Sequence, residues 1–259
     1  MVGHLNSSII WQGGGMSPPP PFTPASISGL QLWLDAADTA TITHSGGSVS
    51  QWDDKSGNGY HATQATGASQ FTTGVSYING RNALLTNGFK FMVLPSGLYT
   101  IPTGNNTIIA VAERDSVDGS ASQALIAGNS YYDNTRSYFI DSADHGTKIS
   151  AQSNGSYGNT IDFAVAKDNL PHAYVMRRNG TTNGVKVWRD GGGGSTPAAG
   201  SNVPLDNLFI GRNDQGIWDQ WKGKIGCILI WNRALTDVEI NQLGNQFLNP
   251  VWGITWTNI

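Results

Sequence analysis

From Ile27 onward, short apolar runs alternate with glycine, asparagine, serine and proline. Seven runs have the length and the β-branched or aromatic content that are typical of strands: 29–35, 107–112, 136–140, 173–178, 184–190, 208–211 and 223–231. The dipeptide Asn179-Gly180 separates two of them and favours a tight hairpin turn. Many short strands with turn residues between them predict an antiparallel sandwich or barrel, and argue against alternating βαβ units.

One helix is predicted near the C-terminus. Thr236 is followed three residues later by Glu239, which is the spacing of a capping box. The apolar stripe after the cap consists of Ile240, Leu243 and Phe247. Pro250 is expected to end the helix, because proline lacks the N–H that a helix interior needs. The tail after it alternates apolar and polar residues, so we expect it to add a strand or to dock elsewhere.

Composition indicates a folded protein with an unusually uncharged surface. Of 259 residues, 39% are hydrophobic and only 13% are charged, with a net charge of −3. Disorder requires low hydrophobicity together with high net charge, and this chain has neither. A pI near 5.9 with scattered charges gives no basic patch for nucleic acid.

Cys227 is the sole cysteine, which excludes an intramolecular disulfide and a cysteine-based zinc cluster. Its apolar neighbours predict a buried, unreactive thiol. The N-terminus shows no signal-peptide pattern, and no run of about 18 apolar residues is present to span a membrane. We therefore expect synthesis in a cytoplasm, with no membrane partner.

Residues 1–25 differ in composition from the remainder. A glycine run at 13–15 and a proline run at 18–21 predict a linker. Leu5, Ile9, Ile10 and Trp11 precede that linker, and we expect these four residues to dock onto a partner or a sister subunit. Ile254 and Trp256 in the tail are expected to form a second docking contact. The alternative is a terminal extension whose apolar residues are incidental. The predicted division is a docking arm and linker at 1–25, a sandwich at 26–250 and a tail at 251–259.

Three stretches together resemble the laminin-G-like, concanavalin A-like jelly-roll superfamily. They are the opening strand at 30–38, the Asp-Lys-Ser-Gly-Asn-Gly turn within 51–63, and the closing segments at 208–211, 221–225 and 230–240 with the sequence Asn-Arg-Ala-Leu-Thr. The resemblance implies an all-β, concanavalin A-like antiparallel β-sandwich with one short C-terminal helix and an extended N-terminal arm. This fold carries lectins, adhesion modules, glycosidases and virion proteins alike, so the function must be argued from residues.

The turn that contains Asp54 has a structural and a functional interpretation. Its carboxylate is suited to accept backbone N–H groups of the turn, while Gly57 and Gly59 supply positive φ. The alternative is a calcium site, since calcium prefers several hard oxygen ligands. The candidate ligands are Asp35, Asp53, Asp54 and Asn58. We favour the turn-capping role, because the spacing of a complete oxygen cage is not visible. Calcium is the only cofactor that the sequence leaves open.

Catalysis is not expected. A retaining glycosidase needs two carboxyl groups about 5–5.5 Å apart, and the chain has only two glutamates, Glu113 and Glu239. Glu239 is explained by the capping box, and Glu113 with Asp115 is expected to lie at a surface turn. The five histidines are scattered, and neither a nucleophile elbow nor a phosphate-binding loop is present.

Two non-catalytic functions remain. The first is a virion accessory protein (a capsid decoration, head-fibre or tail-associated protein) that is made in the host cytoplasm and held by its arm to other virion proteins or sister subunits. The second is a lectin or adhesion module at an extracellular surface that binds glycans. The aromatic residues expected to stack on sugars are Trp218, Trp221, Tyr131 and Tyr132, with the interpretation of Trp221 as a packing residue held equally open.

Overall fold

The computed structural model describes residues 21–96, 98, 105–115, 123–127, 168–180, 184–194, 208–212 and 220–259, together with the backbone of 137–141, 148–150 and 160–162. The strands are β1 (Leu30–Asp35), β2 (Ile42–Ser45), β3 (Ser48–Trp52), β4 (Ala62–Thr63), β5 (Thr72–Ile78), β6 (Arg81–Asn87), β7 (Met92–Val93), β8 (Asn105–Arg114), β9 (Gln123–Ala127), β10 (Ser137–Asp141), β11 (Lys148–Ser150), β12 (Thr160–Asp162), β13 (Pro171–Asn179), β14 (Val185–Arg189), β15 (Phe209–Ile210) and β16 (Lys222–Trp231). The helices are α1 (Asp237–Leu243) and α2 (Asn249–Trp252), with a π turn at Gly244–Leu248 between them and single 3-10 turns at Pro24–Ser26, Thr39–Thr41 and Gly67–Ser69.

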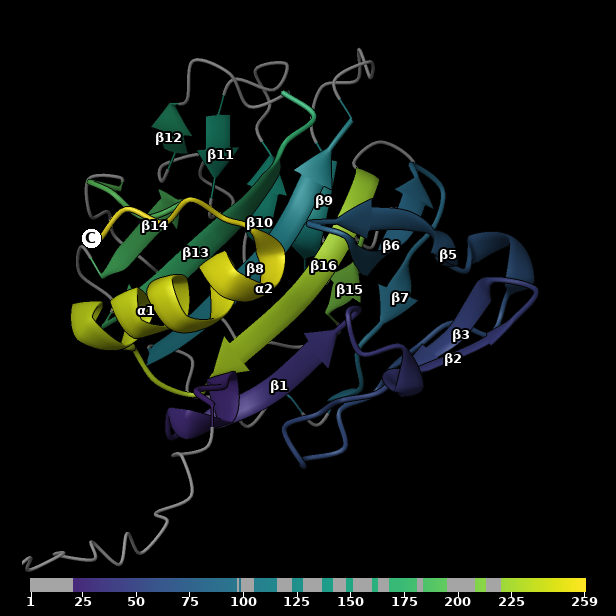
Figure 1. Cartoon of the computed structure of the whole chain (residues 1–259), viewed down its shortest axis with the longest axis horizontal. Coiled ribbons are helices and arrows are strands. Elements are labelled where there is room, and N and C mark those ends of the chain that lie inside the picture. Colours follow the sequence, from purple (N-terminus) through teal and green to yellow (C-terminus); the bar gives the residue numbers. More distant parts are fainter. Residues whose placement is uncertain are drawn as a thin grey trace, which may run out of the picture.

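These strands form one curled antiparallel sheet that folds over itself as a sandwich (Figure 1). The order is β12-β11-β10-β9-β15-β7-β4-β3-β5-β6-β16-β8-β13-β14, with β1 added to β16 and β2 added to β3. We call the part made of β1, β6, β16, β8, β13 and β14 the back sheet, and the part made of β9, β15, β7, β4, β3 and β2 the front sheet. The predicted antiparallel β-sandwich is confirmed.

The back sheet is built around β16, which pairs with β8 along nearly its whole length, with β6 at its start and with β1 at its end. Every residue from Ile225 to Trp231 is buried. A strand covered on both faces needs such a continuous apolar run. The Cys227 side chain is fully buried within it, and burial raises the pKa of its thiol well above the ordinary value. The predicted buried cysteine is confirmed.

The C-terminal helix lies across the outer face of the back sheet, over β13, β8 and β16 (Figure 1). The apolar stripe of Ile240, Leu243 and Phe247 is buried, as predicted. The prediction that Pro250 ends the helix was wrong, because helical structure continues to Trp252. Pro250 follows the wider π turn and lies in the first turn of α2. Proline is tolerated there, because the N–H groups of a first helical turn have no acceptor within their own helix. Gly253, at φ 71°, ends the helix instead.

The tail after α2 belongs to the sandwich, which corrects its predicted role in partner docking. Ile254 is 2% exposed and Trp256 is 8% exposed, because both pack into the core of their own chain. The Trp256 ring lies directly over Gly244, where a Cβ atom would stand only 2.2 Å from it. Thr257 forms a bridge with Gly191 at the end of β14. The expected second docking contact is therefore an intramolecular contact. In the described part of the chain, no helix has the length and apolar character needed to cross a membrane.

Candidate functional site

The Asp54 carboxylate organises the turn after β3. Its Oδ1 accepts hydrogen bonds from the backbone N–H groups of Trp33, at 2.9 Å, and Ser56, at 2.8 Å. Its Oδ2 accepts the Ser56 hydroxyl, at 2.7 Å, and the Tyr60 N–H, at 3.1 Å. Gly57 and Gly59 have φ values of 91° and 77°. The turn-capping interpretation is confirmed, and the turn is tied to β1 through Trp33.

The four candidate calcium ligands are engaged in other contacts. The Lys55 ammonium lies 3.0 Å from Asp35 Oδ2 and 2.9 Å from Asp38 Oδ2. Asp53 accepts a hydrogen bond from Gln51, and the Asn58 side chain faces the backbone carbonyl of Gln31 with its donor end. Across the described residues, no group of three or more His, Cys, Asp or Glu side chains is arranged to hold a metal. These residues therefore do not fit a calcium ion.

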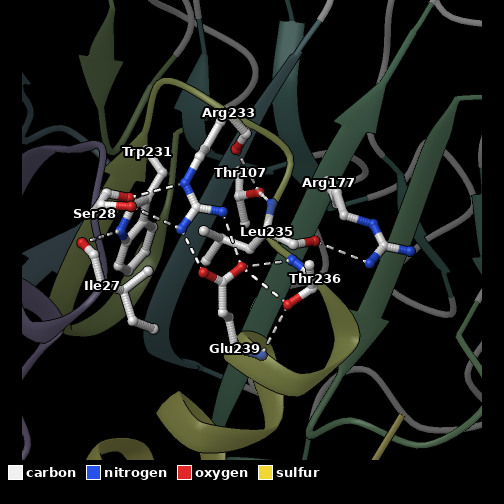
Figure 2. A network of polar contacts seen from close by, with 9 residues as sticks. All are labelled: Ile27, Ser28, Thr107, Arg177, Trp231, Arg233, Leu235, Thr236 and Glu239. Atoms are coloured by element: carbon white, nitrogen blue, oxygen red, sulfur yellow. Dashed lines mark hydrogen bonds and ion pairs between the residues drawn. The ribbon is translucent and has the colours of Figure 1, made fainter.

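The closing Asn-Arg-Ala-Leu-Thr segment joins the strand β16 to the helix (Figure 2). Arg233 forms a two-point ion pair with Glu239, at 2.9 and 2.5 Å, and its Nε donates to the Ser28 carbonyl. The buried Thr107 hydroxyl donates to the Arg233 carbonyl and accepts from Leu235 N–H. These groups satisfy one another, so the segment that is typical of the family supports the fold.

The capping box of Thr236 and Glu239 is formed as predicted. The hydrogen bond from Arg233 lowers the pKa of Glu239 to about 2, against the opposing effect of burial, and bonds from Thr236 add to it. Glu239 is therefore a carboxylate committed to holding the start of α1.

The other glutamate is paired as well. Glu113 lies within β8, one residue before its end, and its carboxylate is 2.7 Å from the Lys224 ammonium on β16. Asp115 lies 3.4 Å from the Lys222 ammonium. The expected surface turn at Glu113 was wrong, because β8 extends through Arg114. Both carboxylates face lysines of the neighbouring strand, which supplies their partners.

Most of the predicted sugar-binding and docking residues lie outside the described residues. These are Trp218, Tyr131, Tyr132, Leu5, Ile9, Ile10 and Trp11. Trp221 is described and is only 2% exposed, with its ring edge against Tyr174. A stacking role for Trp221 is therefore wrong, and the alternative interpretation as a packing residue is confirmed.

The front sheet has an outer face that side chains of five strands share. Strand register places Thr43, Gln51, Thr63, Val93 and Phe209 in one row across β2, β3, β4, β7 and β15. Each of them keeps part of its surface exposed. Their neighbours one position along, Ile42, Trp52, Ala62, Met92 and Ile210, are all buried. The row is therefore the solvent-facing side of the front sheet, opposite to the core.

An aromatic platform with a guanidinium group lies on this face. The rings of Phe91 and Phe209 meet edge to face, with centroids 6.1 Å apart. The Arg212 guanidinium carbon lies 3.3 Å from the Phe91 centroid and 4.8 Å from the Phe209 centroid. All three residues are partly exposed. We call Phe91, Phe209 and Arg212 the aromatic–arginine platform.

Sequence reasoning missed this platform. Phe209 stands between Leu208 and Ile210, so no polar alternation marks it as outward-facing. The only local signal is the alternation Phe89-Lys90-Phe91. The three residues come from a loop, from β15 and from the residues after β15, and only the strand pairing of β7 with β15 brings them together.

A second charged cluster lies at the open end of the β13–β14 hairpin. His172 is 8% exposed. Its Nδ1 is 2.5 Å from Asp190 Oδ2, and its Nε2 is 2.9 Å from Asp168 Oδ2. Asp190 has φ 56°, and its backbone carbonyl accepts the N–H of Thr257 in the tail. The cluster therefore fastens the hairpin end to the C-terminal tail.

Comparison with known proteins identifies the family. Residues 86–241, more than half of the chain, match the concanavalin A-like lectin/glucanase superfamily. The chain belongs to this superfamily. Comparison with curated proteins gives no significant match.

Solved structures share the fold of this superfamily member at low sequence identity. Trypanosoma rangeli sialidase in complex with sialic acid has a TM-score of 0.59 and 18% identity, over 86% of this chain and 35% of that chain. Domain 4 of AbnA, an extracellular arabinanase from Geobacillus stearothermophilus in complex with arabinotriose, has a TM-score of 0.58 and 14% identity, over 83% and 98%. The binding domain of Paraclostridial Mosquitocidal Protein 1 has a TM-score of 0.54 and 14% identity, over 88% and 54%.

The chain thus spans about a third of the length of the sialidase structures, and nearly the whole of the arabinanase domain. At these identities the likeness establishes a lectin-like jelly-roll fold, which occurs in enzymes and in non-catalytic binding domains alike.

Proposed function

We propose that this protein is a non-catalytic glycan-binding module whose binding surface is the outer face of the front sheet. The observation that carries the proposal is the aromatic–arginine platform, which lies in an outward row that also holds Thr43, Gln51 and Thr63. Sugar recognition needs an apolar ring to stack on and polar groups that fix orientation.

The chemistry of the platform suits a sugar. The C–H face of a pyranose or furanose ring stacks on an aromatic ring, and the positive charge of a guanidinium beside that ring attracts hydroxyl or carboxylate oxygens. The hydroxyl of Thr63 and the amide of Gln51 extend the polar part of the row. The arabinanase domain, which this chain matches over 98% of its length, is a complex with arabinotriose, and this supports a saccharide ligand class for the fold.

The carboxylates support binding without hydrolysis. Glu113 faces Lys224, and Glu239 is held by Arg233 and Thr236. A general acid needs a raised pKa, whereas the pKa of Glu239 is lowered to about 2. Both glutamates of the chain are therefore committed to structural contacts.

Replacing Phe209 with alanine is expected to weaken glycan binding by about tenfold, because the stacking surface is lost while the neighbouring Ile210 stays in the core. The measurement is a glycan array followed by calorimetric titration with the best-binding oligosaccharide. Val238→Ala removes an exposed apolar side chain from α1, which lies over the back sheet, and serves as the control. Equal loss in both variants, or none in Phe209→Ala, would contradict the assignment of this face.

A second proposed role is that of a virion accessory protein, anchored by its N-terminal segment to other virion proteins and displaying the sandwich. The described chain joins the core of the sandwich at Phe22 and Pro24, directly after the N-terminal segment. Pro24 is buried, Phe22 packs on the core, and the Ile27 carbonyl accepts the Trp231 indole N–H at 3.3 Å. The segment before residue 21 is therefore attached at a fixed point. Since Ile254 and Trp256 are buried, the anchoring role falls on that segment alone.

Deleting residues 1–20 is expected to abolish co-sedimentation with the purified source particle and to leave glycan binding unchanged. The deletion stops at residue 20, since Phe22 and Pro24 support the core. The full chain is the control for attachment. If the deletion variant co-sediments as well as the full chain, the anchoring role is wrong, whatever the glycan result.

A further inference from the structure

We infer that the open edge of β5 is a docking surface for the N-terminal segment of a second copy of this chain, which adds to it as an extra strand. The inference rests on the docking role proposed above for that segment, and it is independent of glycan binding. The surface consists of the backbone edge from Val75 to Ile78 with the side chains of Val75 and Tyr77.

Among the described residues, strand β5 is paired fully along one edge and only at its start along the other. It lies against β6 from Thr72 to Ile78. On its other edge, the described residues provide one pairing, Ser48 with Thr72, and one further backbone bond, from Thr73 N–H to the Gly47 carbonyl. Beyond Thr73, the described strands offer no partner to this edge. An unpaired strand edge is a template on which another strand can add.

The exposed face beside this edge is apolar. Val75 is 60% exposed and Tyr77 is 54% exposed, whereas Ser76 and Ile78 between and after them are buried. The strand contains no charged residue. Proteins usually protect an edge strand with lysine, proline, a bulge or a covering segment. This edge carries neither lysine nor proline, and its one irregularity, at Gly74, lies before the regular stretch from Val75 to Ile78. This stretch is therefore suited to accept an added strand.

The N-terminal segment has the matching pattern. Residues 5–11 read Leu-Asn-Ser-Ser-Ile-Ile-Trp, so an extended conformation would place Leu5, Ile9 and Trp11 on one face. No acidic or basic side chain other than His4 occurs in residues 1–20. An uncharged segment with one apolar face therefore meets an uncharged edge with an apolar face. Main-chain hydrogen bonds would supply affinity, while alternate side chains fix the register.

The arrangement favours exchange between two copies. The described chain begins beside the start of β1, at the lower left of Figure 1, whereas β5 lies on the right-hand side. Ten residues, 12–21, join Trp11 to Phe22, and they span about 33 Å when fully extended. The prolines at 18–21 are expected to extend the chain away from its attachment point, and the glycines at 13–15 to let the apolar segment before them dock on a neighbour.

The test is the mass of the full chain by light scattering during gel filtration, compared with the deletion of residues 1–20 and with Val75→Lys/Tyr77→Lys. We expect an oligomer for the full chain, a monomer for the deletion, and a dissociation constant raised roughly tenfold or more by the two lysines. Val238→Lys, at an equally exposed apolar position on α1, is the matched control and is expected to leave the mass unchanged. Thermal unfolding of each variant checks that it folds.

A mixing experiment identifies the contact directly. Chains with Ile9→Cys and chains with Tyr77→Cys are combined under mild oxidation, where the buried Cys227 does not react. The expected product is a mixed disulfide of the two chains, and Val238→Cys in place of Tyr77→Cys is expected to give none. A monomeric full chain, a deletion variant that stays oligomeric, or equal cross-linking to both cysteines would overturn the inference. Glycan binding and particle attachment are measured on the same preparations, so failure of the proposed function is recognised separately.

Discussion

Replacing Asp54 with alanine is expected to lower the free energy of unfolding by about 3–5 kcal/mol, because its carboxylate accepts four hydrogen bonds that no other group replaces. The Trp33 N–H is buried in β1. Without the Asp54 carboxylate it would be a buried donor with no acceptor, which costs the full desolvation free energy of that group. The turn after β3 and its attachment to β1 are expected to loosen together. The measurement is equilibrium denaturation followed by tryptophan fluorescence.

Asp53→Ala is the matched control, since it removes the neighbouring carboxylate. Asp53 is partly exposed, accepts one hydrogen bond from Gln51 and lies 3.3 Å from His61 Nδ1. Partly exposed polar pairs contribute little, so we expect a loss below about 1 kcal/mol. Similar losses for Asp53→Ala and Asp54→Ala would show that the turn depends on net negative charge and not on the backbone bonds of Asp54. Added calcium is expected to change neither stability.

The second large effect concerns His172 and pH. Burial alone lowers the pKa of this imidazole, but hydrogen bonds and charge from Asp190 and Asp168 outweigh it and raise the pKa above 6.5, against the opposing charge of Arg189. A group whose pKa is raised on folding stabilises the native state below its unfolded pKa. That contribution is lost as pH rises through the folded pKa. We therefore expect the free energy of unfolding to fall as pH rises above the ordinary histidine pKa of 6.5.

His172→Gln is expected to remove this part of the pH dependence and to lower stability by about 2–4 kcal/mol at mildly acidic pH, because two carboxylates lose the cation between them. The measurement is denaturant unfolding at a series of pH values. A second readout is the rate of proteolysis of the C-terminal tail, which is expected to rise when the contacts of Thr257 loosen. His44→Gln, at an exposed position on β2, is the control. A pH profile that stays parallel to that of the unchanged protein would disprove the role of the cluster.

Local features of this protein could be predicted from sequence. The capping box at Thr236 and the turn at Asp54 depend on residues within about six positions of one another, so their chemistry is visible in the order of residues. The apolar run of β16 likewise predicts a strand, because a strand that is buried on both faces consists of a nearly continuous apolar run.

Features that depend on distant partners could not be predicted. The alternation at Ile254 and Trp256 is compatible with an intermolecular contact and with an intramolecular one. The structure shows the intramolecular contact, because the Trp256 ring packs over Gly244 of the same chain. Pro250 was expected to end the helix, but the preceding π turn let the helix continue.

The sequence by itself determined the antiparallel, strand-rich class, the capped helix and the buried Cys227, since these follow from short-range hydrophobic periodicity and turn chemistry. Its resemblance to the concanavalin A-like superfamily implied the jelly roll. Only the tertiary structure decided that Phe209 faces outward beside Phe91 and Arg212, that Trp221 faces inward, and that the described strands leave the outer edge of β5 unpaired beyond Thr73. The physical reason is that a strand's face and edge are fixed by its pairing partners, which lie far away along the chain.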